Sequence, residues 1–406
     1  MNKNVRTVLH HMKRLVIKGT HAVIGIFPKD DNLVLFSAWF GKKYQDSSRY
    51  VYEYCLAHNE FNVYWYAADK VLYSKLKAEG KPVVYAKSLE GIWKQIRAKM
   101  LVSSIQLADF NHFFLKKCIY LDLGHGMPIK QSGYEQPDVT QRYINYEKLL
   151  RKDISFYMCE SSTTSMHIIS RAFRISPKNI VFCNKPRTDV LYDPSLRAGK
   201  NKIVDQLKGD KKAIVYMPTH RSGGAVRINT CELMDMDTIQ KLAEEYNFVF
   251  LIKKHFYHRN EKDDVDKYPN IFDITDQDID PQTLVYQADA LISDYSASYI
   301  DYLLLDRPII FFTYDIDEFL KTERNLYFKF SENHAGAKAV TKEELNDAIR
   351  NVCKDWKDPE HAEGRRAARL RYFDDDCPVG NARESIVKIM HELINGTYHS
   401  KWENSK

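Results

Sequence analysis

The sequence lacks the paired cysteines and the long apolar segments that mark several large classes of protein. Its seven cysteines are scattered singly along 406 residues, with no CxxC pair. This scatter argues against a zinc ribbon or a dithiol redox site and favours a reducing compartment. No run of about 18 apolar residues is present, so no membrane-spanning helix is expected. Since no convincing signal peptide is found either, we expect a protein that is cytoplasmic or peripheral to a membrane.

A large excess of charge of one sign is also missing. Sixty basic and 54 acidic residues give a net charge of +6. Proteins that bind nucleic acid cluster their basic residues more strongly, and no recognition motif for RNA or DNA is found, so no nucleic-acid partner is expected. The sequence does have 44% hydrophobic residues. Its length suits two globular domains, each with its own core.

Residues 1–28 are predicted to form a basic amphipathic helix. Such a helix can associate with an anionic membrane surface. The alternative is an ordinary surface helix packed on its domain, and both interpretations stay open. The apolar positions at helical spacing are Val5, Val8, Leu9, Met12, Leu15 and Val16, and the basic positions are Lys3, Arg6, Lys13, Arg14 and Lys18.

After Pro28, strand-like apolar runs alternate with helical patterns, which is typical of parallel sheets built from βαβ units. We predict an α/β fold with two doubly wound, Rossmann-like lobes that face a central cleft. The first lobe is expected at 29–196, a Lys-rich hinge at 197–212, the second lobe at 213–375, and a C-terminal helix and tail at 376–406. The predicted strands lie at 33–38, 62–67, 101–105, 118–121, 156–159 and 181–183, and then at 213–217, 248–252, 290–293 and 309–312.

Three histidines follow predicted strands. In open parallel sheets, ligands bind at the carboxyl ends of the strands. His125, His220 and His255 fall there, and Arg221 lies beside the second of them. One histidine in such a place usually only satisfies local hydrogen bonds. Three in the same relative position, together with an arginine, favour a functional site. Gly126 after His125 allows a close approach of the backbone.

The loop 293–298 precedes a predicted helix. The N–H groups and the dipole at a helix N-terminus favour phosphate, and Ser296 adds a hydroxyl. Capping of the helix by Ser293, Asp294 or Ser296 is the alternative. Asp301, one turn later, either accepts hydrogen bonds from ribose hydroxyls or is a solvated helix residue.

Two further segments carry polar candidates. Lys254, beside His255, is either a surface charge or a contact for a polyanionic substrate. Arg187 and Asp189 follow the last strand of the first lobe, either in a polar turn or in the site.

Taken in order, these segments resemble the CDP-glycerol glycerophosphotransferases of bacterial teichoic acid and capsule synthesis. The similarity covers about residues 120–320. Gly124 and Met127 depart from the family pattern W-H-G-T-P, His220 stands where an aromatic or other residue is usual, Phe256 replaces a proline and Ala297 replaces a serine. The matching segments are HGMPIK at 125–130, PRTD at 186–189, YMPTHR at 216–221, KH at 254–255, SDYSA at 293–297 and RPIIFFTYD at 307–315.

The resemblance implies a GT-B-like fold with the nucleotide in the C-terminal lobe. It implies that an acceptor hydroxyl attacks the β-phosphorus of CDP-glycerol and releases CMP. His125 would be the general base, and His255 and Arg221 would stabilise charge on the diphosphate. The expected donor-binding residues are Gly126, Arg187, Asp189, Thr219, Lys254, Ser293, Asp294, Ser296 and Asp301.

Partners and alternatives follow from the same resemblance. No metal site and no cofactor are expected, because positioning and basic groups can support phosphoryl transfer. The expected partners are CDP-glycerol, a lipid-linked saccharide or polyol-phosphate acceptor, and the anionic inner face of the bacterial cell membrane. A related transferase that uses CDP-ribitol or a nucleotide sugar is the first alternative. A non-catalytic scaffold of the same pathway is the second.

Overall fold

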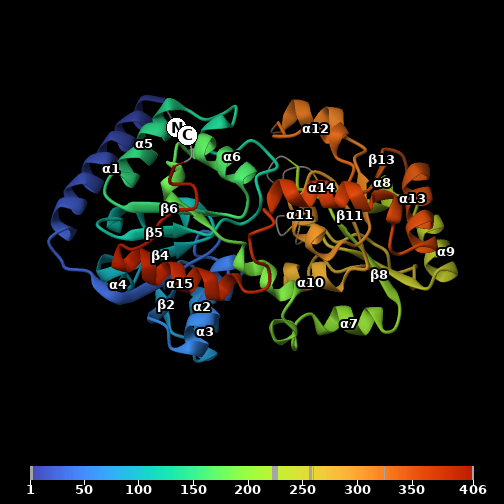
Figure 1. Ribbon diagram of the computed structural model, residues 1–406, viewed down its shortest axis with the longest axis horizontal. Helices are drawn as coiled ribbons and strands as arrows, with labels where there is room; N and C mark the ends of the chain where they lie inside the picture. The colour runs from blue at the N-terminus through green and yellow to red at the C-terminus, as the bar shows by residue number, and fades with distance from the viewer. Residues whose placement is uncertain (1–2, 222–226, 256–257, 259, 324, 405–406) are drawn as a thin grey trace. The chain divides into compact units, whose positions relative to one another are not determined.

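The structure, a computed structural model, describes residues 3–221, 227–255, 258, 260–323 and 325–404. The chain divides into two compact units (Figure 1). Unit 1 contains Met1–His125, Asp138–Asp189 and Asp376–Lys406, and unit 2 contains Gly126–Pro137 and Val190–Asp375.

Unit 1 is built on a seven-stranded parallel sheet with the strand order β3-β2-β1-β4-β5-β6-β7. Six of the seven strands were predicted, and the three-residue strand β3 was not. The strands are β1 (Asp30–Phe36), β2 (Asn62–Ala67), β3 (Val83–Tyr85), β4 (Ala98–Ser103), β5 (Ile119–Asp122), β6 (Ser155–Glu160) and β7 (Ile180–Phe182).

Helices cover both faces of this sheet. One face packs against residues that include Met166 of α6, and the other against residues that include Val51 of α2 and Ile386 of α15. Side-chain caps start several helices, such as Ser162, which accepts a hydrogen bond from the N–H of Ser165 at 3.0 Å. The helices are α1 (Lys3–Ile24), α2 (Asp46–His58), α3 (Lys70–Ala78), α4 (Leu89–Arg97), α5 (Gln141–Arg151), α6 (Thr163–Phe173) and α15 (Ala382–Asn395).

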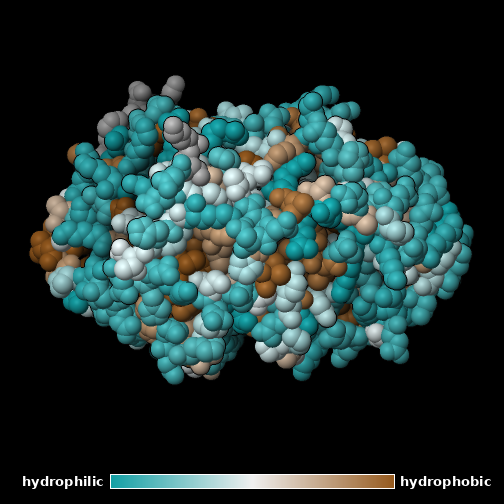
Figure 2. All heavy atoms as spheres, viewed as in Figure 1, coloured by the Kyte–Doolittle hydropathy of each residue, from teal (hydrophilic) through white to brown (hydrophobic). Residues whose placement is uncertain are grey.

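From Met12 onward, helix α1 packs on the rest of unit 1 through one side. Ile17, His21 and Ile24 are buried, and His21 pairs with Asp153 at 3.1 Å. On another side, large apolar side chains stay exposed, and Figure 2 shows hydrophobic residues gathered over the end of α1 at the left edge of the view. The exposed apolar residues of this part of the chain are Met12, Leu15, Val16, Val23 and Ile26.

Unit 2 contains a six-stranded parallel sheet with the order β10-β9-β8-β11-β12-β13. The strands are β8 (Lys212–Met217), β9 (Phe248–Ile252), β10 (Ile271–Asp273), β11 (Ala290–Ser293), β12 (Ile309–Phe312) and β13 (Ala337–Ala339). The helices are α7 (Lys202–Lys208), α8 (Thr230–Leu233), α9 (Met236–Glu245), α10 (Pro281–Gln287), α11 (Ser298–Tyr302), α12 (Ile316–Thr322), α13 (Lys342–Lys354) and α14 (Ala362–Tyr372).

The boundaries of the units differ from the expected ones. The segment 197–212, expected to be a hinge, contains α7 and belongs to unit 2, because Lys208 pairs with Asp289 at 2.6 Å. The C-terminal segment is part of unit 1, where α15 buries Ile386 and Met390 in the core. Among the helices in the described part of the chain, none has the length and apolar character needed to traverse a membrane.

Candidate active site

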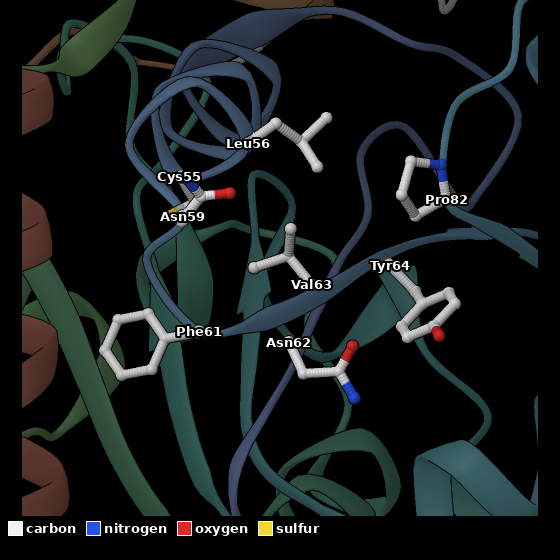
Figure 3. A pocket seen from close by; sticks show the side chains of 8 residues that line it. All are labelled: Cys55, Leu56, Asn59, Phe61, Asn62, Val63, Tyr64 and Pro82. Carbon is white, nitrogen blue, oxygen red and sulfur yellow. The ribbon is translucent and has the colours of Figure 1, made fainter.

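Two hollows in unit 1 lie away from the expected site. One, of about 150 Å³, is lined by residues from the end of α2 and the start of β2, including Asn59, Phe61 and Val63 (Figure 3). The other, of about 660 Å³, is lined by residues at the start of β4, β5 and β6. Both lie at the amino ends of parallel strands, the opposite edge from the one where such sheets bind ligands. The strand ends at the carboxyl edge are therefore the candidate site.

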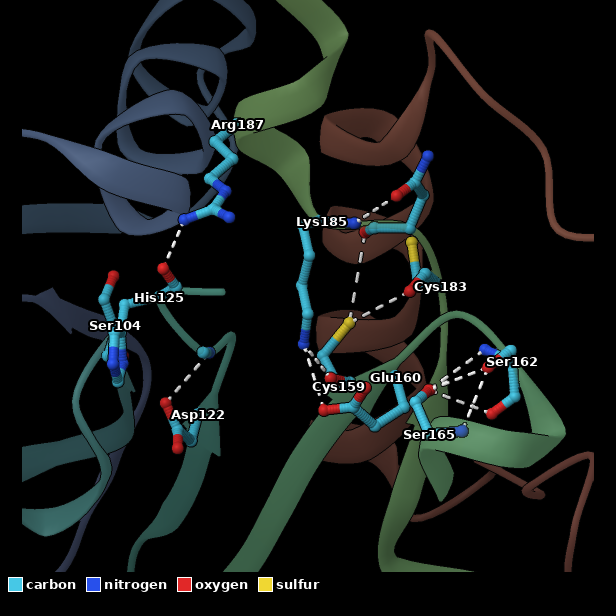
Figure 4. Close-up of polar contacts among 12 residues, drawn as sticks. Ser104, Asp122, His125, Cys159, Glu160, Ser162, Ser165, Cys183, Lys185 and Arg187 are labelled. Atoms are coloured by element: carbon cyan, nitrogen blue, oxygen red, sulfur yellow. Dashed lines mark hydrogen bonds and ion pairs between the residues drawn. The ribbon is translucent and has the colours of Figure 1, made fainter. Parts of the chain in front are cut away.

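His125 lies three residues after β5 and presents an exposed imidazole. Its Nδ1 is 3.2 Å from the carbonyl oxygen of Ser104 (Figure 4). Since a carbonyl only accepts, Nδ1 must carry the proton, and Nε2 is then the proton acceptor. The indole of Trp39 meets the imidazole edge to face, with ring centroids 5.5 Å apart.

The electrostatic surroundings of His125 favour the neutral imidazole. Desolvation by the surrounding protein lowers the pKa of His125 although part of its ring is exposed, and the opposing effect of Asp46 is smaller. A group with a pKa below 6.5 is unprotonated at neutral pH. His125 is therefore in the state that a general base requires.

Arg187 holds the backbone at His125. Its guanidinium donates a hydrogen bond to the carbonyl of His125 (Figure 4). It also lies 3.4 Å from Asp46. The side chain is almost completely buried. The structure thus brings Arg187 together with the predicted base, in unit 1.

Buried charges that were not predicted lie at neighbouring strand ends. The ammonium of Lys185 is 3.2 Å from Glu160 at the end of β6 and also donates to the carbonyl of Cys159. Asp122 ends β5 and accepts the N–H of Gly124 at 3.0 Å. Burial raises the pKa of Asp122 to about 7, although that N–H and Lys185 oppose the shift. Asp122 and Glu160 could have been predicted from the sequence, because each is an acidic residue at the end of an apolar strand.

Asp189 contacts the start of α15, and its donor-binding role stays a prediction. It accepts hydrogen bonds from the N–H groups of Ala382 and Arg383 at 2.9 and 2.8 Å and pairs with the Arg383 side chain. These contacts hold the start of α15. Gly126 opens the segment 126–137, which belongs to unit 2.

In unit 2, Arg221 lies between two carboxylates. Its guanidinium contacts Asp315 at 2.7 and 3.0 Å and Asp294 at 3.0 Å, and it also donates to the carbonyl of Thr219. Burial opposes the charged form, but Asp294 and Asp315 raise the pKa of Arg221 well above its ordinary value. Asp294 also accepts the N–H of Thr219 at 2.9 Å. The predicted residues meet, but Asp315, 94 residues from Arg221, was missed.

The serines of the 293–298 loop contact their own surroundings. Ser293 donates to the carbonyl of Met217 at 3.2 Å, and Ser296 accepts from the hydroxyl of Ser298 at 2.9 Å. Ser296 also accepts the N–H of Ser298, the first residue of α11, at 3.3 Å, so its hydroxyl contacts the start of this helix as the capping interpretation expects, although the residue at the cap position is Ala297. Asp301 is buried within α11 and is not the solvated residue of the alternative interpretation.

Lys254 is buried in an ion-pair network, so it is not the surface charge of the alternative interpretation, and its contact with the donor stays a prediction. Its ammonium is 2.8 Å from Asp263 and 3.7 Å from Asp273, and none of the three side chains is exposed. It also donates to the carbonyl of Glu261. His255, the next residue, is partly exposed and faces His220, with ring centroids 4.8 Å apart.

Comparison with known proteins identifies the family. The model of the CDP-glycerol:poly(glycerophosphate) glycerophosphotransferase family matches residues 21–392. The chain belongs to this family. The resemblance drawn from the sequence motifs is thus confirmed, and with it the expectation of a glycerophosphotransferase.

Two relatives and one solved structure illustrate the similarity. A teichoic acid glycerol-phosphate transferase of Staphylococcus aureus (strain NCTC 8325 / PS 47) is 25% identical over 93% of this chain and 98% of its own length. A teichoic acid ribitol-phosphate polymerase of the same strain, TarL, is 31% identical, but over 47% of this chain and 34% of its own length. The wall teichoic acid polymerase TagF superposes with a TM-score of 0.74 at 23% identity, covering 98% of this chain and 100% of that chain. This likeness confirms the GT-B-like fold.

Proposed function

We propose that this protein transfers glycerol phosphate from CDP-glycerol to a hydroxyl of a membrane-linked acceptor or of a growing poly(glycerol phosphate) chain. The observation that carries the proposal is His125, whose Nδ1 is occupied by the Ser104 carbonyl and whose pKa lies below its ordinary value. The family of the chain supports the donor.

In the proposed reaction, the acceptor oxygen bonds to the β-phosphorus of CDP-glycerol while the bond from that phosphorus to the CMP oxygen breaks. The hydroxyl proton goes to Nε2 of His125, and the electron pair of the broken bond stays on CMP. His125 supplies the proton transfer, and the groups of unit 2 bind and neutralise the phosphates.

We propose that Arg221 fixes the loops of unit 2 and does not bind the diphosphate directly. One guanidinium between Asp294 and Asp315 leaves a local charge of −1, which disfavours a phosphate at that point. Its contacts fix the Thr219 and Asp294 loops at the ends of β8 and β11. His255 then remains the candidate for charge stabilisation on the diphosphate, with Thr219, Ser293, Ser296 and Asp301 as candidates for phosphate and ribose contacts.

The test is product analysis with CDP-glycerol and a lipid-linked disaccharide acceptor. We expect CMP and glycerol phosphate incorporation to appear in equal amounts, and we expect His125→Gln to abolish both while donor binding persists. Wild-type turnover by folded His125→Gln protein would refute the assignment of the base. No turnover by the wild-type protein with any donor would favour the scaffold alternative.

CDP-ribitol is the alternative donor, because the similarity to the ribitol-phosphate polymerase reaches 31% identity over about half of the chain. The glycerol-phosphate transferase matches over 93% of the chain, which favours glycerol. Running both donors side by side separates these alternatives. A nucleotide sugar would release a nucleoside diphosphate in place of CMP.

We also propose that the protein works on the cytoplasmic face of the cell membrane. Leu15 of α1 is 68% exposed, and Ile26, two residues past the end of α1, is 75% exposed, whereas Ile17, His21 and Ile24 of the helix are buried. Helix α4 adds Trp93, which is 46% exposed and contacts Phe27 edge to face. Exposed apolar residues beside Lys13 and Lys18 fit the interface of an anionic bilayer.

Sedimentation with anionic vesicles at low salt tests this proposal. Leu15→Glu together with Ile26→Glu should reduce pelleting, whereas the same change at an exposed apolar residue of α3, Val71→Glu, serves as the matched control. Removal of residues 1–19 should reduce pelleting as well. Equal pelleting of all variants would leave α1 as an ordinary packed helix.

A further inference from the structure

Asp109 is a buried carboxylate that ties together two loops of unit 1. It ends the short helix at Gln106–Asp109 and is 2% exposed. One carboxylate oxygen accepts the N–H of Phe40 at 2.6 Å, and the other accepts those of Ser104 and Ile105, both at 2.9 Å. Three backbone donors thus converge on one side chain.

Each of the two loops contacts His125. The carbonyl of Ser104 accepts the Nδ1 proton of the imidazole (Figure 4), so the N–H of Ser104 held by Asp109 belongs to the residue that fixes the tautomer. In the other loop, Trp39 packs its indole against the same imidazole. Asp109 therefore holds the backbone of both loops whose residues contact the imidazole of His125.

The loop that carries Trp39 has a backbone that needs support. Trp39 and Phe40 have φ angles of 52° and 62°, and Gly41 follows at 69°. Left-handed backbone at two large aromatic residues costs free energy and persists only where the surroundings hold it. The hydrogen bond from Phe40 to Asp109, and the one from the Trp39 indole to Asp46 at 3.2 Å, supply that support.

We propose that Asp109 is a positioning residue that orients His125 through Ser104 and through the Trp39–Phe40 loop. The inference rests on the proposed function, in which His125 is the general base. A base displaced by about 1 Å can lose about 10²-fold in rate, so the effect of Asp109 on transfer is large although it does not touch a substrate.

The charge state of Asp109 is consistent with this role. Burial raises its pKa to about 6, although the three N–H donors oppose the shift, and Asp46 adds to it. Asp122 and Tyr120 of β5 are the other titratable groups on which its charge acts. At neutral pH the carboxylate is therefore mostly ionised, the form that accepts all three N–H groups.

The variant Asp109→Asn tests the proposal, because an amide offers one acceptor oxygen and turns two further donors toward the backbone N–H groups. We expect kcat to fall about 10–100-fold with the KM for CDP-glycerol unchanged. Added to His125→Gln, Asp109→Asn should cause no further loss of rate, since both changes remove the same function. Tyr52→Phe, which removes the hydrogen bond of a buried hydroxyl to the carbonyl of Pro82 at the amino edge of the sheet, controls for lost stability and should leave kcat unchanged.

A measurement on the wild-type protein keeps the proposal falsifiable if Asp109→Asn does not fold. Nitrogen-15 NMR of labelled histidine should show His125 as the Nδ1–H tautomer at pH 7.5, and a dominant Nε2–H tautomer would overturn the inference. Wild-type kcat in folded Asp109→Asn, with His125→Gln inactive, would overturn the inference alone. Full activity of His125→Gln would instead overturn the proposed base.

Discussion

Replacement of Lys254 by methionine separates a structural role from a donor contact. The ammonium lies 2.8 Å from Asp263 and 3.7 Å from Asp273, with all three side chains inaccessible to solvent. Lys254→Met keeps the length of the side chain but leaves two buried carboxylates without their cation. Removal of one partner from a buried ion pair costs about 3–5 kcal/mol. In a unit of roughly 200 residues this lowers the melting temperature by about 6–20 °C.

Calorimetry of the full chain measures this shift. Because the chain has two units, unfolding is not treated as two-state, and the readout is the first transition that moves. Lys253→Met is the matched control, since Lys253 donates to the carbonyls of Ile274 and Gln277, which are neutral acceptors. An unchanged melting temperature for Lys254→Met, together with a raised KM for CDP-glycerol, would refute the structural role and restore the donor contact.

Three further outcomes are expected. The kcat of transfer should fall on the acid side only below about pH 6.5, because the pKa of His125 is lowered from its ordinary value and the base must be unprotonated; a limb centred above pH 7 would contradict this. Asp122 has its pKa raised to about 7, so the folded state holds a proton that the unfolded state releases near pH 4, and stability should decrease as pH rises from about 4 to 7 and then level off. Asp122→Asn should flatten that dependence in melting curves, and an unchanged slope would show that Asp122 does not cause it. Finally, treatment with EDTA followed by gel filtration should leave transfer activity unchanged, and restoration by Mg²⁺ of a lost activity would refute the metal-independent proposal.

The elements that could be predicted are those whose sequence pattern is complete within one segment. The apolar runs predicted at 290–293 and 309–312 are strands β11 (Ala290–Ser293) and β12 (Ile309–Phe312), with the same bounds. The apolar spacing of residues 386, 389, 390 and 393 predicts a helix over 382–395, which α15 (Ala382–Asn395) matches. The pair Asp280-Pro281 predicts a helix start, and α10 begins there with Asp280 as the cap. The strands that were not predicted, β3, β10 and β13, have three residues each, although β7, which is equally short, was predicted to within one residue.

The sequence predicts where several site residues lie along the chain, but not which residues they contact. His125, Arg221 and Asp294 lie at strand ends as expected, because the alternation of strands and helices determines where a parallel sheet ends. Asp109 and Phe40 are 69 residues apart in the chain, and Arg221 and Asp315 are 94 apart. Such pairs depend on how loops from different strands meet, which no local pattern encodes.

The motif residues divide into two groups by their environment. His125 and His255 keep exposed surface at the strand ends, as groups that meet a substrate must. The buried residues Asp189, Arg221 and Lys254 instead form ion pairs within their own unit. In a site that binds phosphates, buried charges of this kind hold the loops in place, because an ion pair without water has a defined geometry. Some motif residues of this chain therefore hold the loops of the site, and others carry its chemistry. Substitution of a buried charged motif residue should lower the stability of its unit, and its effect on turnover should be interpreted only after stability has been measured.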